Sequence, residues 1–256
     1  MIFVTGDTHA DFKRFNTRNF PYQREMSKDD TVIVLGDFGG VWDYLGEMTD
    51  ECYRLDWLNN APFTTMYVDG NHENFDRYYS DEYPVVDFYG GKAHKIRDSV
   101  YHLMRGHVFN IEGNKFFAMG GAKSHDIRGG IFDTANYPTE DEAMAEYDKW
   151  RAEGREFRIN HFSWWEEEIP SQEEMDLGKA NLEANHYEVD YVISHCLPQS
   201  VACAAGFMEP DPLTNYFDDL LNSGLKFKRW YCGHYHREKV VWGKFIIKYW
   251  EIERIV

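Results

Sequence analysis

The sequence predicts an α/β fold, and three observations point to it. Short apolar runs alternate with segments of helical spacing in the N-terminal part of the chain, an order that favours parallel strands joined by crossover helices. Polar residues follow directly on these apolar runs, where open α/β sheets place their ligands. The chain has 256 residues, 43% of them hydrophobic and 17% aromatic, so one domain spanning residues 1–256 can bury a large core.

The N-terminal elements are expected to alternate between strand and helix. Residues 2–4 form a short apolar strand, and residues 10–20 have the spacing of a helix with phenylalanines on its inner face. The second strand covers residues 31–35. Helical spacing returns over residues 47–59, and residues 63–68 give the third strand.

Four short strands are expected next, arranged as a meander. They occupy residues 92–96, 100–104, 107–111 and 115–119, and residues 112–114 have the composition of a hairpin turn between the last two.

Residues 122–186 are polar and irregular, and we expect a cap-like insertion that covers the site rather than a separate domain. A helix is predicted over residues 139–151. Ser171 and Glu174 have the spacing of a capping box, which predicts a second helix running towards His186.

Strand patterning resumes in the C-terminal part of the chain. Residues 187–194 and 227–232 are expected to be strands, with a helix over residues 213–221 between them. Residues 240–250 have the pattern of a hairpin that completes a sheet.

Charge and composition limit the classes of partner. Asp and Glu number 44 against 27 Lys and Arg, a formal net charge of −17, which argues against duplex nucleic acid and anionic membranes as partners. We find no secretory leader and no apolar stretch of membrane-spanning length. The four cysteines have no paired spacing and are expected to be free thiols, so we expect a cytoplasmic protein. Nothing in the sequence indicates the oligomeric state.

Five strand-end motifs carry side chains that bind metal ions. They are Gly6-Asp7-Thr8-His9, Gly36-Asp37, Gly70-Asn71-His72-Glu73, Ser194-His195 and Gly233-His234-Tyr235-His236. Imidazole, carboxylate and amide oxygen together suit Mn, Fe or Zn. Asp37 is the natural bridge between two ions about 3.5–4 Å apart, and a water held between such ions loses its proton near neutral pH to give a hydroxide nucleophile.

The order and content of the five motifs resemble the calcineurin-like metallophosphoesterase superfamily, in particular its small bacterial and phage-borne members. The resemblance spans nearly the whole chain and implies a four-layer αββα sandwich of two mixed sheets flanked by helices. It also implies two divalent ions, with Mn²⁺ expected and Fe, Zn or Ni as alternatives. By position, the first ion would be bound by Asp7, His9 and His236, the second by Asn71, His195 and His234, and both by Asp37. His72 would face the substrate, stabilising phosphoryl charge or acting as general acid.

The second motif departs from the protein phosphatase branch of that superfamily. The branch extends it to GDxxDRG, whose Arg binds phosphate and whose Asp orients the catalytic His, whereas residues 38–42 here are Phe-Gly-Gly-Val-Trp. We therefore expect a phosphoester hydrolase that acts on a small phosphodiester or nucleotide, and the group that orients His72 stays open. The alternatives are a phosphomonoesterase or protein phosphatase, a nuclease, and a non-catalytic metal-binding interaction module.

Several residues outside the motifs have two interpretations. The loop with Lys123, His125, Asp126 and Arg128 either reaches the phosphate or is solvated. Arg77 either clamps a phosphate oxygen or forms a salt bridge. Trp164 and Trp165 are expected to pin the insertion to the core. The remaining histidines match no motif and are expected to be structural: His94, His102, His107, His161 and His186.

Overall fold

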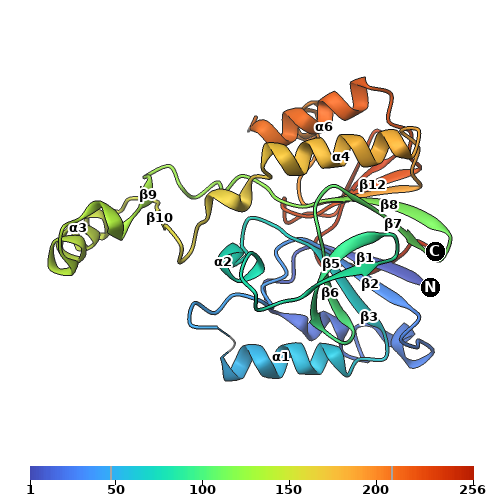
Figure 1. Ribbon diagram of the computed structural model, residues 1–256, viewed down its shortest axis with the longest axis horizontal. Helices are drawn as coiled ribbons and strands as arrows, with labels where there is room; N and C mark the ends of the chain where they lie inside the picture. The colour runs from blue at the N-terminus through green and yellow to red at the C-terminus, as the bar shows by residue number, and fades with distance from the viewer. Residues whose placement is uncertain (47, 209) are drawn as a thin grey trace.

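A computed structural model describes residues 1–46, 48–208 and 210–256 of the protein. Two large sheets lie face to face between two layers of helices (Figure 1), so the predicted αββα sandwich is confirmed. The two chain ends lie side by side, and the backbone N–H of Ile2 donates to the carbonyl of Val256 over 3.2 Å.

The first sheet places three of the motifs at one edge. Its strands are β1 (Ile2–Thr5), β2 (Thr31–Leu35), β3 (Thr64–Val68), β4 (Val85–Phe88), β5 (Gly91–Arg97), β6 (Val100–Leu103) and β15 (Glu253–Arg254), in the order β15-β1-β2-β3-β6-β5-β4. β1, β2 and β3 are neighbours and parallel. Their carboxyl ends, which the first three motifs follow, therefore lie together.

The second sheet brings the other two motifs together at the carboxyl ends of two neighbouring strands. Its strands are β7 (His107–Ile111), β8 (Asn114–Met119), β11 (Tyr191–Ser194), β12 (Arg229–Cys232), β13 (Lys239–Val241) and β14 (Phe245–Ile247), in the order β13-β14-β12-β11-β8-β7. β11 and β12 are parallel neighbours in the middle of this sheet. The space between the two sheets is filled by aliphatic and aromatic side chains from both, such as Ile33, Val68 and Ile193.

Helices cover the outer face of each sheet (Figure 1). α1 (Thr49–Asn59) packs on the first sheet through Leu55 and Leu58. α4 (Gln172–Ala184), α5 (Gln199–Ala205) and α6 (Pro212–Asn222) cover the second sheet. The predicted helix over residues 47–59 thus matches α1 from Thr49 onward, and residue 47 lies outside the described residues. Within the described part of the chain, no helix combines the length and the apolar character needed to cross a membrane.

The predicted helix over residues 10–20 is wrong. The segment contains one short 3₁₀ turn, η1 (Phe12–Phe15), and a second turn, η2 (Pro21–Arg24), follows it. The Asn16 side chain accepts the backbone N–H groups of Arg18 and Asn19, which gives the chain a local alternative to the helix. The phenylalanines face the core as expected, because apolar spacing fixes burial more firmly than it fixes the helix.

The single meander is also wrong. β5 and β6 pair in the first sheet, whereas β7 and β8 pair in the second, so the chain changes sheets between β6 and β7. Gly106, with φ of 77°, lies at this crossing. The predicted turn between β7 and β8 is confirmed: Glu112 and Gly113 have φ of 49° and 77°, as a tight hairpin requires.

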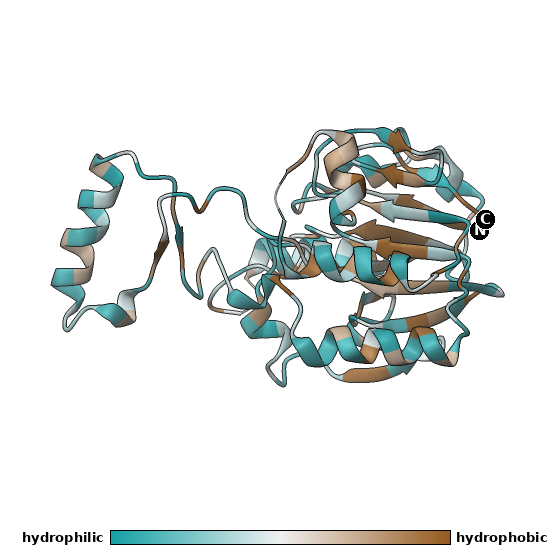
Figure 2. Cartoon of the chain, turned by 90° about the horizontal axis from the view of Figure 1, so that it is seen from above, coloured by the Kyte–Doolittle hydropathy of each residue, from teal (hydrophilic) through white to brown (hydrophobic). Residues whose placement is uncertain are grey.

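The predicted insertion has two different parts. Its later part forms the capping box at Ser171 and then α4, which packs on the second sheet. Residues 125–165, which we call the arm, stand away from the sandwich (Figures 1 and 2). The arm contains β9 (Ile131–Phe132), η3 (Thr134–Asn136), α3 (Glu140–Ala152) and β10 (Arg158–Ile159), and its rings pack on one another around Phe132 and Trp150.

The arm is fixed to the sandwich at its root. Trp165 is fully buried and meets the Trp42 ring edge to face at 5.7 Å. Its indole N–H donates to Asp76 over 2.7 Å. Trp165 therefore pins the segment to the core, as expected, and a 3₁₀ turn, η4 (Glu166–Glu168), leads from it towards α4.

Asp69 closes β3 with a buried ionic network, and its loss should destabilise the fold. The carboxylate accepts the Arg105 side chain at 2.9 and 2.6 Å and faces His102 Nε2 at 3.0 Å. Asp69→Asn should lower the free energy of unfolding at pH 7 by about 3 kcal/mol, because buried Arg105 loses its fully buried charge partner and keeps only the partly exposed Glu174 carboxylate among the described residues. Urea unfolding measures this. The exposed pair of Asp87 and Lys92 gives the control, and Asp87→Asn should leave the midpoint unchanged.

The pH dependence of that loss has a definite sign. Burial alone would raise the pKa of Asp69, but Arg105 and His102 lower it below its ordinary value. The stability that Asp69 contributes is therefore present above the unfolded pKa and is lost as pH falls towards the folded one. The difference between the variant and the parent should shrink in acid. A difference that is constant from pH 7 to pH 3 would contradict the ionic origin.

Candidate metal centre

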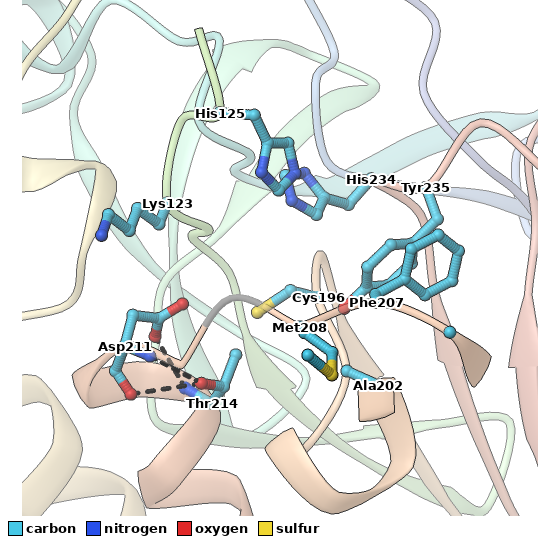
Figure 3. Close-up of a pocket in the computed structure, with 11 residues that line it drawn as sticks. Lys123, His125, Cys196, Ala202, Phe207, Met208, Asp211, Thr214, His234 and Tyr235 are labelled. Atoms are coloured by element: carbon cyan, nitrogen blue, oxygen red, sulfur yellow. Dashed lines mark hydrogen bonds between the residues drawn. The ribbon is translucent and has the colours of Figure 1, made fainter. Parts of the chain in front are cut away.

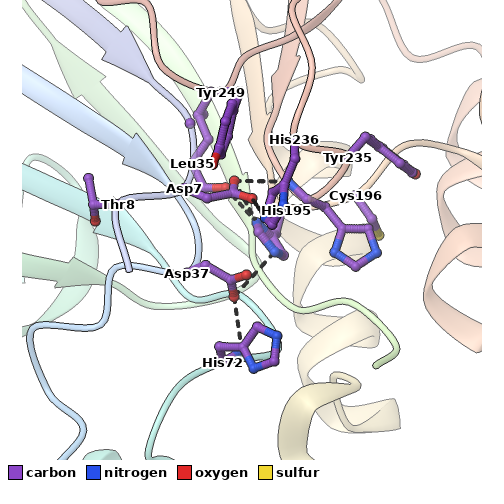
Figure 4. A network of polar contacts seen from close by, with 12 residues as sticks. Asp7, Thr8, Leu35, Asp37, His72, His195, Cys196, Tyr235, His236 and Tyr249 are labelled. Carbon is purple, nitrogen blue, oxygen red and sulfur yellow. Dashed lines mark hydrogen bonds and ion pairs between the residues drawn. The ribbon is translucent and has the colours of Figure 1, made fainter. Parts of the chain in front are cut away.

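The side chains that follow β1, β2, β11 and β12 converge where the two sheets meet (Figure 4). Asp7, His9, Asp37 and His236 each offer one ligand atom, and these atoms all lie within 4.8 Å of one another. His9 Nε2 is 3.2 Å from His236 Nε2 and 3.6 Å from Asp37 Oδ2. Two imidazoles and two carboxylates aimed at one point are a donor set for a transition-metal ion.

Three further predicted ligands lie beside this group. His195 Nε2 is 3.3 Å from Asp37 Oδ1, on the side of the carboxylate that does not face His9. The ring of His234 is 5.0 Å from that of His195, and its backbone N–H donates to Asp7 Oδ1 over 2.9 Å. Asn71 stands between Gly70 and His72, whose backbones both lie against Asp37 Oδ1, and its amide nitrogen donates to Ser124 Oγ over 3.1 Å.

Three buried atoms of predicted ligands have no hydrogen-bond partner among the described residues: Asp7 Oδ2, Asn71 Oδ1 and His195 Nε2. Asp7 Oδ2 lies 3.0 Å from His236 Nε2 but without the alignment of a hydrogen bond. The other nitrogen of His195, Nδ1, lies 2.7 Å from the Leu35 carbonyl, which keeps a proton on Nδ1 and turns Nε2 towards Asp37 as the atom that would bind a metal. Unpaired buried polar atoms are costly, and bound cations would satisfy all three. The residues therefore fit a metal site.

The glycines of three motifs, Gly36, Gly70 and Gly233, leave room for a ligand from another motif. A Cβ on Gly70 would lie 2.1 Å from Asp37 Oδ1, and one on Gly233 would lie 2.1 Å from Asp7 Oδ1. A Cβ on Gly36 would lie 2.2 Å from the His195 ring. The glycines thus let the ligands approach across the strands, which explains why Gly precedes the ligands in these motifs.

Backbone strain is concentrated at the same positions. Four of the predicted ligands have a backbone φ in the left-handed region, which residues other than Gly rarely adopt. The values are 44° for His9, 46° for Asp37, 68° for His234 and 49° for His236. Such conformations cost on the order of 1–3 kcal/mol each and cluster at functional sites. The fold tolerates this cost at four of the seven predicted ligands.

The neighbouring histidines keep the Asp37 carboxylate of the site ionised, and the carboxylates in turn act on the histidines. Burial alone would raise the pKa of Asp37, but the surrounding histidines, His195 first, hold it well below its ordinary value. Burial alone would lower the pKa of His195, but Asp37 and Asp7 raise it above its ordinary value. Burial lowers the pKa of His234, with the neighbouring His195 and His125 adding to the effect. Since a ligand imidazole must be neutral, a metal ion at His195 would have to displace a proton.

His72 faces a pocket beside the cluster rather than the cluster itself. Its backbone N–H donates to Asp37 Oδ1 over 2.9 Å, and its ring lies 5.6 Å from the His9 ring. The open pocket has a volume of about 420 Å³ and is lined by His9, Ala10, Gly39, Trp42, Asp43, Glu51, Arg54, His72 and Arg158. Among the described residues, no hydrogen bond holds the His72 ring.

Two supporting carboxylates were not predicted as such. Glu168 accepts both the backbone N–H and the hydroxyl of Ser124, the residue that holds the Asn71 amide. Glu73 accepts the Phe38 backbone N–H over 2.7 Å and so ties the third motif to the second. Ser124 and Glu168 are far apart in sequence, and no spacing rule could have found them. Glu73 belongs to the third motif, and its place there is the one feature of the sequence that could have indicated its supporting role.

The residues with two interpretations are now placed. Arg77 forms ion pairs of 2.5 Å with Glu51 and Glu82, so the salt-bridge interpretation holds. The ring of His125 lies 4.6 Å from that of His234, so its loop reaches the site. A second pocket of about 230 Å³ opens there (Figure 3), and its lining includes Lys123, His125, Phe207, His234 and Tyr235.

Comparison with known proteins agrees with this geometry. A search of curated proteins found no match. The family model described as calcineurin-like phosphoesterase matches residues 1–238, a range that holds all five motifs and both pockets. The chain therefore belongs to the calcineurin-like phosphoesterase family.

Proposed function

We propose that the protein is a dinuclear metal-dependent hydrolase of phosphoesters that prefers a small phosphodiester or nucleotide. The observation that carries the proposal is the cluster of Asp7, His9, Asp37 and His236, whose ligand atoms lie within 4.8 Å of one another. The family supplies the reaction class, since its members are phosphoesterases.

Seven side chains would hold the ions. Asp7, His9 and His236 would bind the first, Asn71, His195 and His234 the second, and Asp37 both. Mn²⁺ is the favoured ion, with Fe, Zn or Ni as alternatives, because the donors are nitrogen and oxygen without sulfur. When bound, the two cations supply positive charge to the phosphoryl oxygens and lower the pKa of water to give a nucleophile at neutral pH.

His72 would act on the phosphoryl group. Burial lowers the pKa of its imidazole, although the Asp37 carboxylate opposes this. The ring is therefore neutral near pH 7, and a neutral imidazole still donates one N–H. This favours hydrogen bonding to a phosphoryl oxygen, where charge develops during attack, over transfer of a proton.

The two pockets favour a diester over a monoester. One pocket holds His9 and His72, and the other holds His234, so they open on the two groups of predicted ligands. A phosphodiester has two organic substituents, and each would have a pocket. A phosphoprotein substrate is disfavoured because Gly40 and Val41 stand where the protein phosphatase branch has the Asp that orients its catalytic His and the Arg that binds phosphate.

A substrate panel tests the function. With Mn²⁺, the protein should hydrolyse bis-p-nitrophenyl phosphate with a kcat/KM roughly tenfold above that for p-nitrophenyl phosphate, since the second substituent adds binding energy of about 1.4 kcal/mol or more. EDTA should abolish both activities. A preference for the monoester would overturn the diester proposal. Absence of metal-dependent hydrolysis across mono-, di-, cyclic and pyrophosphate esters would overturn the hydrolase itself and favour a metal-binding interaction module.

A further inference from the structure

Arg158 brings a positive charge from the arm into the pocket of His72. It lies on β10, in the part of the chain that stands away from the sandwich (Figure 1), yet it lines the same pocket as His9 and His72. No motif contains Arg158, and nothing in its sequence neighbourhood places it near the metal centre.

The guanidinium of Arg158 is held in one orientation. Its Nε donates to Asp126 Oδ2 over 2.7 Å, and its Nη2 contacts the same oxygen. Both residues belong to the arm and are 32 positions apart. Within the described residues Nη1 makes no hydrogen bond, so the far corner of the planar group keeps its donors for a ligand.

Among the described residues, neither acidic residue of the pocket lining, Asp43 or Glu51, forms an ion pair with Arg158. Glu51 forms its ion pair with Arg77 at 2.5 Å and accepts the backbone N–H groups of Trp42 and Asp43 at 2.8 and 2.9 Å. The negative charge of buried Glu51 is therefore balanced by Arg77 and by two backbone N–H groups, and not by Arg158. An anion that enters beside His72 therefore meets an uncommitted edge of the Arg158 guanidinium.

The root of the arm fixes where Arg158 lies. Trp42, which lines the pocket, packs against Trp165 of the arm. His161, three residues after Arg158, contacts the Asp76 carboxylate at 2.9 Å. The arm is thus joined to the sandwich at two points shortly after Arg158, at His161 and at Trp165, and movement of the arm relative to His72 is restrained at its base.

We propose that Arg158 is a phosphate-binding residue that the arm delivers to the site, and that Asp126 is its positioning residue. Arg158 would contact a non-bridging oxygen of the phosphodiester next to His72. A guanidinium suits this because it offers paired donors to phosphate oxygens in a fixed plane. The inference rests on the proposed function and names the part of the chain that selects for an anionic phosphoryl group.

Inorganic phosphate and bis-p-nitrophenyl phosphate are the probes that test it, on the full-length Mn²⁺-loaded protein. Arg158→Ala should raise the Kd for phosphate, measured by calorimetry, and lower kcat/KM for the diester, each by roughly tenfold or more, the size of a lost charged hydrogen bond. Arg158→Lys should recover part of the loss. Asp126→Asn should give a smaller loss in the same direction. The metal content of all variants should equal that of the parent.

Two controls separate contact with phosphate from integrity of the arm. Arg151, on α3, lies over the Tyr147 ring and is exposed, so Arg151→Ala should match the parent in both measurements. Guanidinium chloride at millimolar concentration, with chloride held constant, should restore part of the activity of Arg158→Ala. An equal loss in Arg151→Ala, or no recovery with either lysine or guanidinium, would overturn the contact.

The outcomes distinguish this inference from the proposed function. If the parent hydrolyses the diester and Arg158→Ala equals it in Kd and kcat/KM, the role of Arg158 is wrong and the function stands. If the parent hydrolyses no phosphoester but Arg158→Ala weakens phosphate binding tenfold, the function is wrong and the phosphate site stands.

Discussion

Asp37→Asn is expected to remove most of the bound metal and to lower kcat/KM for the diester by about 10³-fold or more, equivalent to roughly 4 kcal/mol of transition-state stabilisation. The two oxygens of Asp37 face different groups: Oδ2 is 3.6 Å from His9 Nε2, and Oδ1 is 3.3 Å from His195 Nε2. An amide keeps one oxygen and loses the negative charge, so it cannot serve two cations. Metal content after desalting, measured together with turnover, tests this.

The control for that variant must keep the fold while changing a carboxylate elsewhere. Asp87→Asn, at an exposed pair on β4, should retain full metal content and full activity. Asp37→Asn can still accept the His72 backbone N–H but loses the buried charge that faces His195, so the melting temperature without metal should fall, and metal content is compared at a temperature where both proteins are folded. Two ions per chain in Asp37→Asn would show that Asp37 does not bridge.

His72→Ala should separate metal binding from turnover. The variant should keep the metal content of the parent and lose roughly 10²–10⁴-fold in kcat, the range that a positioned acid–base or hydrogen-bonding side chain contributes. KM should change less, because the phosphate retains its contacts with the cations. The physical basis is placement: the His72 ring lies in the open pocket, whereas its backbone alone contacts Asp37.

Steady-state kinetics and metal analysis on the same preparation of His72→Ala test whether His72 acts in turnover without binding metal. His107→Gln, on the edge strand β7, changes a histidine remote from the motifs and should behave as the parent. His72→Ala with full activity would remove His72 from the mechanism. Loss of an ion in His72→Ala would instead make it a ligand.

The sequence predicts the centre of this site better than its surroundings, for a physical reason. Asp7, Asp37 and His195 follow buried strands, and parallel strands end at one edge, so local pattern and general topology together place them. Arg158 and Asp126 reach His72 only through the course of a long arm, which no local pattern encodes. The same holds for Glu168, which supports Asn71 through Ser124.

In the fold, too, features set by local sequence pattern were predicted better than features set by long-range pairing. The positions of β1, β2 and β3 follow from apolar runs, whereas β4 and β15 were not predicted, and the capping box at Ser171 correctly begins α4. The pairing of β5 to β8 depends on which sheet each hairpin joins, and alternation of side chains carries no information on that choice. The region of residues 10–20 was misassigned because the hydrogen bonds of the Asn16 side chain compete with helical ones.

The contact between His9 and His236 sets the order of events during synthesis. Their ring nitrogens are 3.2 Å apart although 227 positions separate them in the chain. At ribosomal rates of about 5–20 residues per second, His236 is made roughly 10–45 s after His9. Asp7 and Asp37 therefore leave the ribosome long before the donors from the second sheet exist. A metal site that needs donors from both sheets would therefore be complete only after the loop that follows β12 has been made.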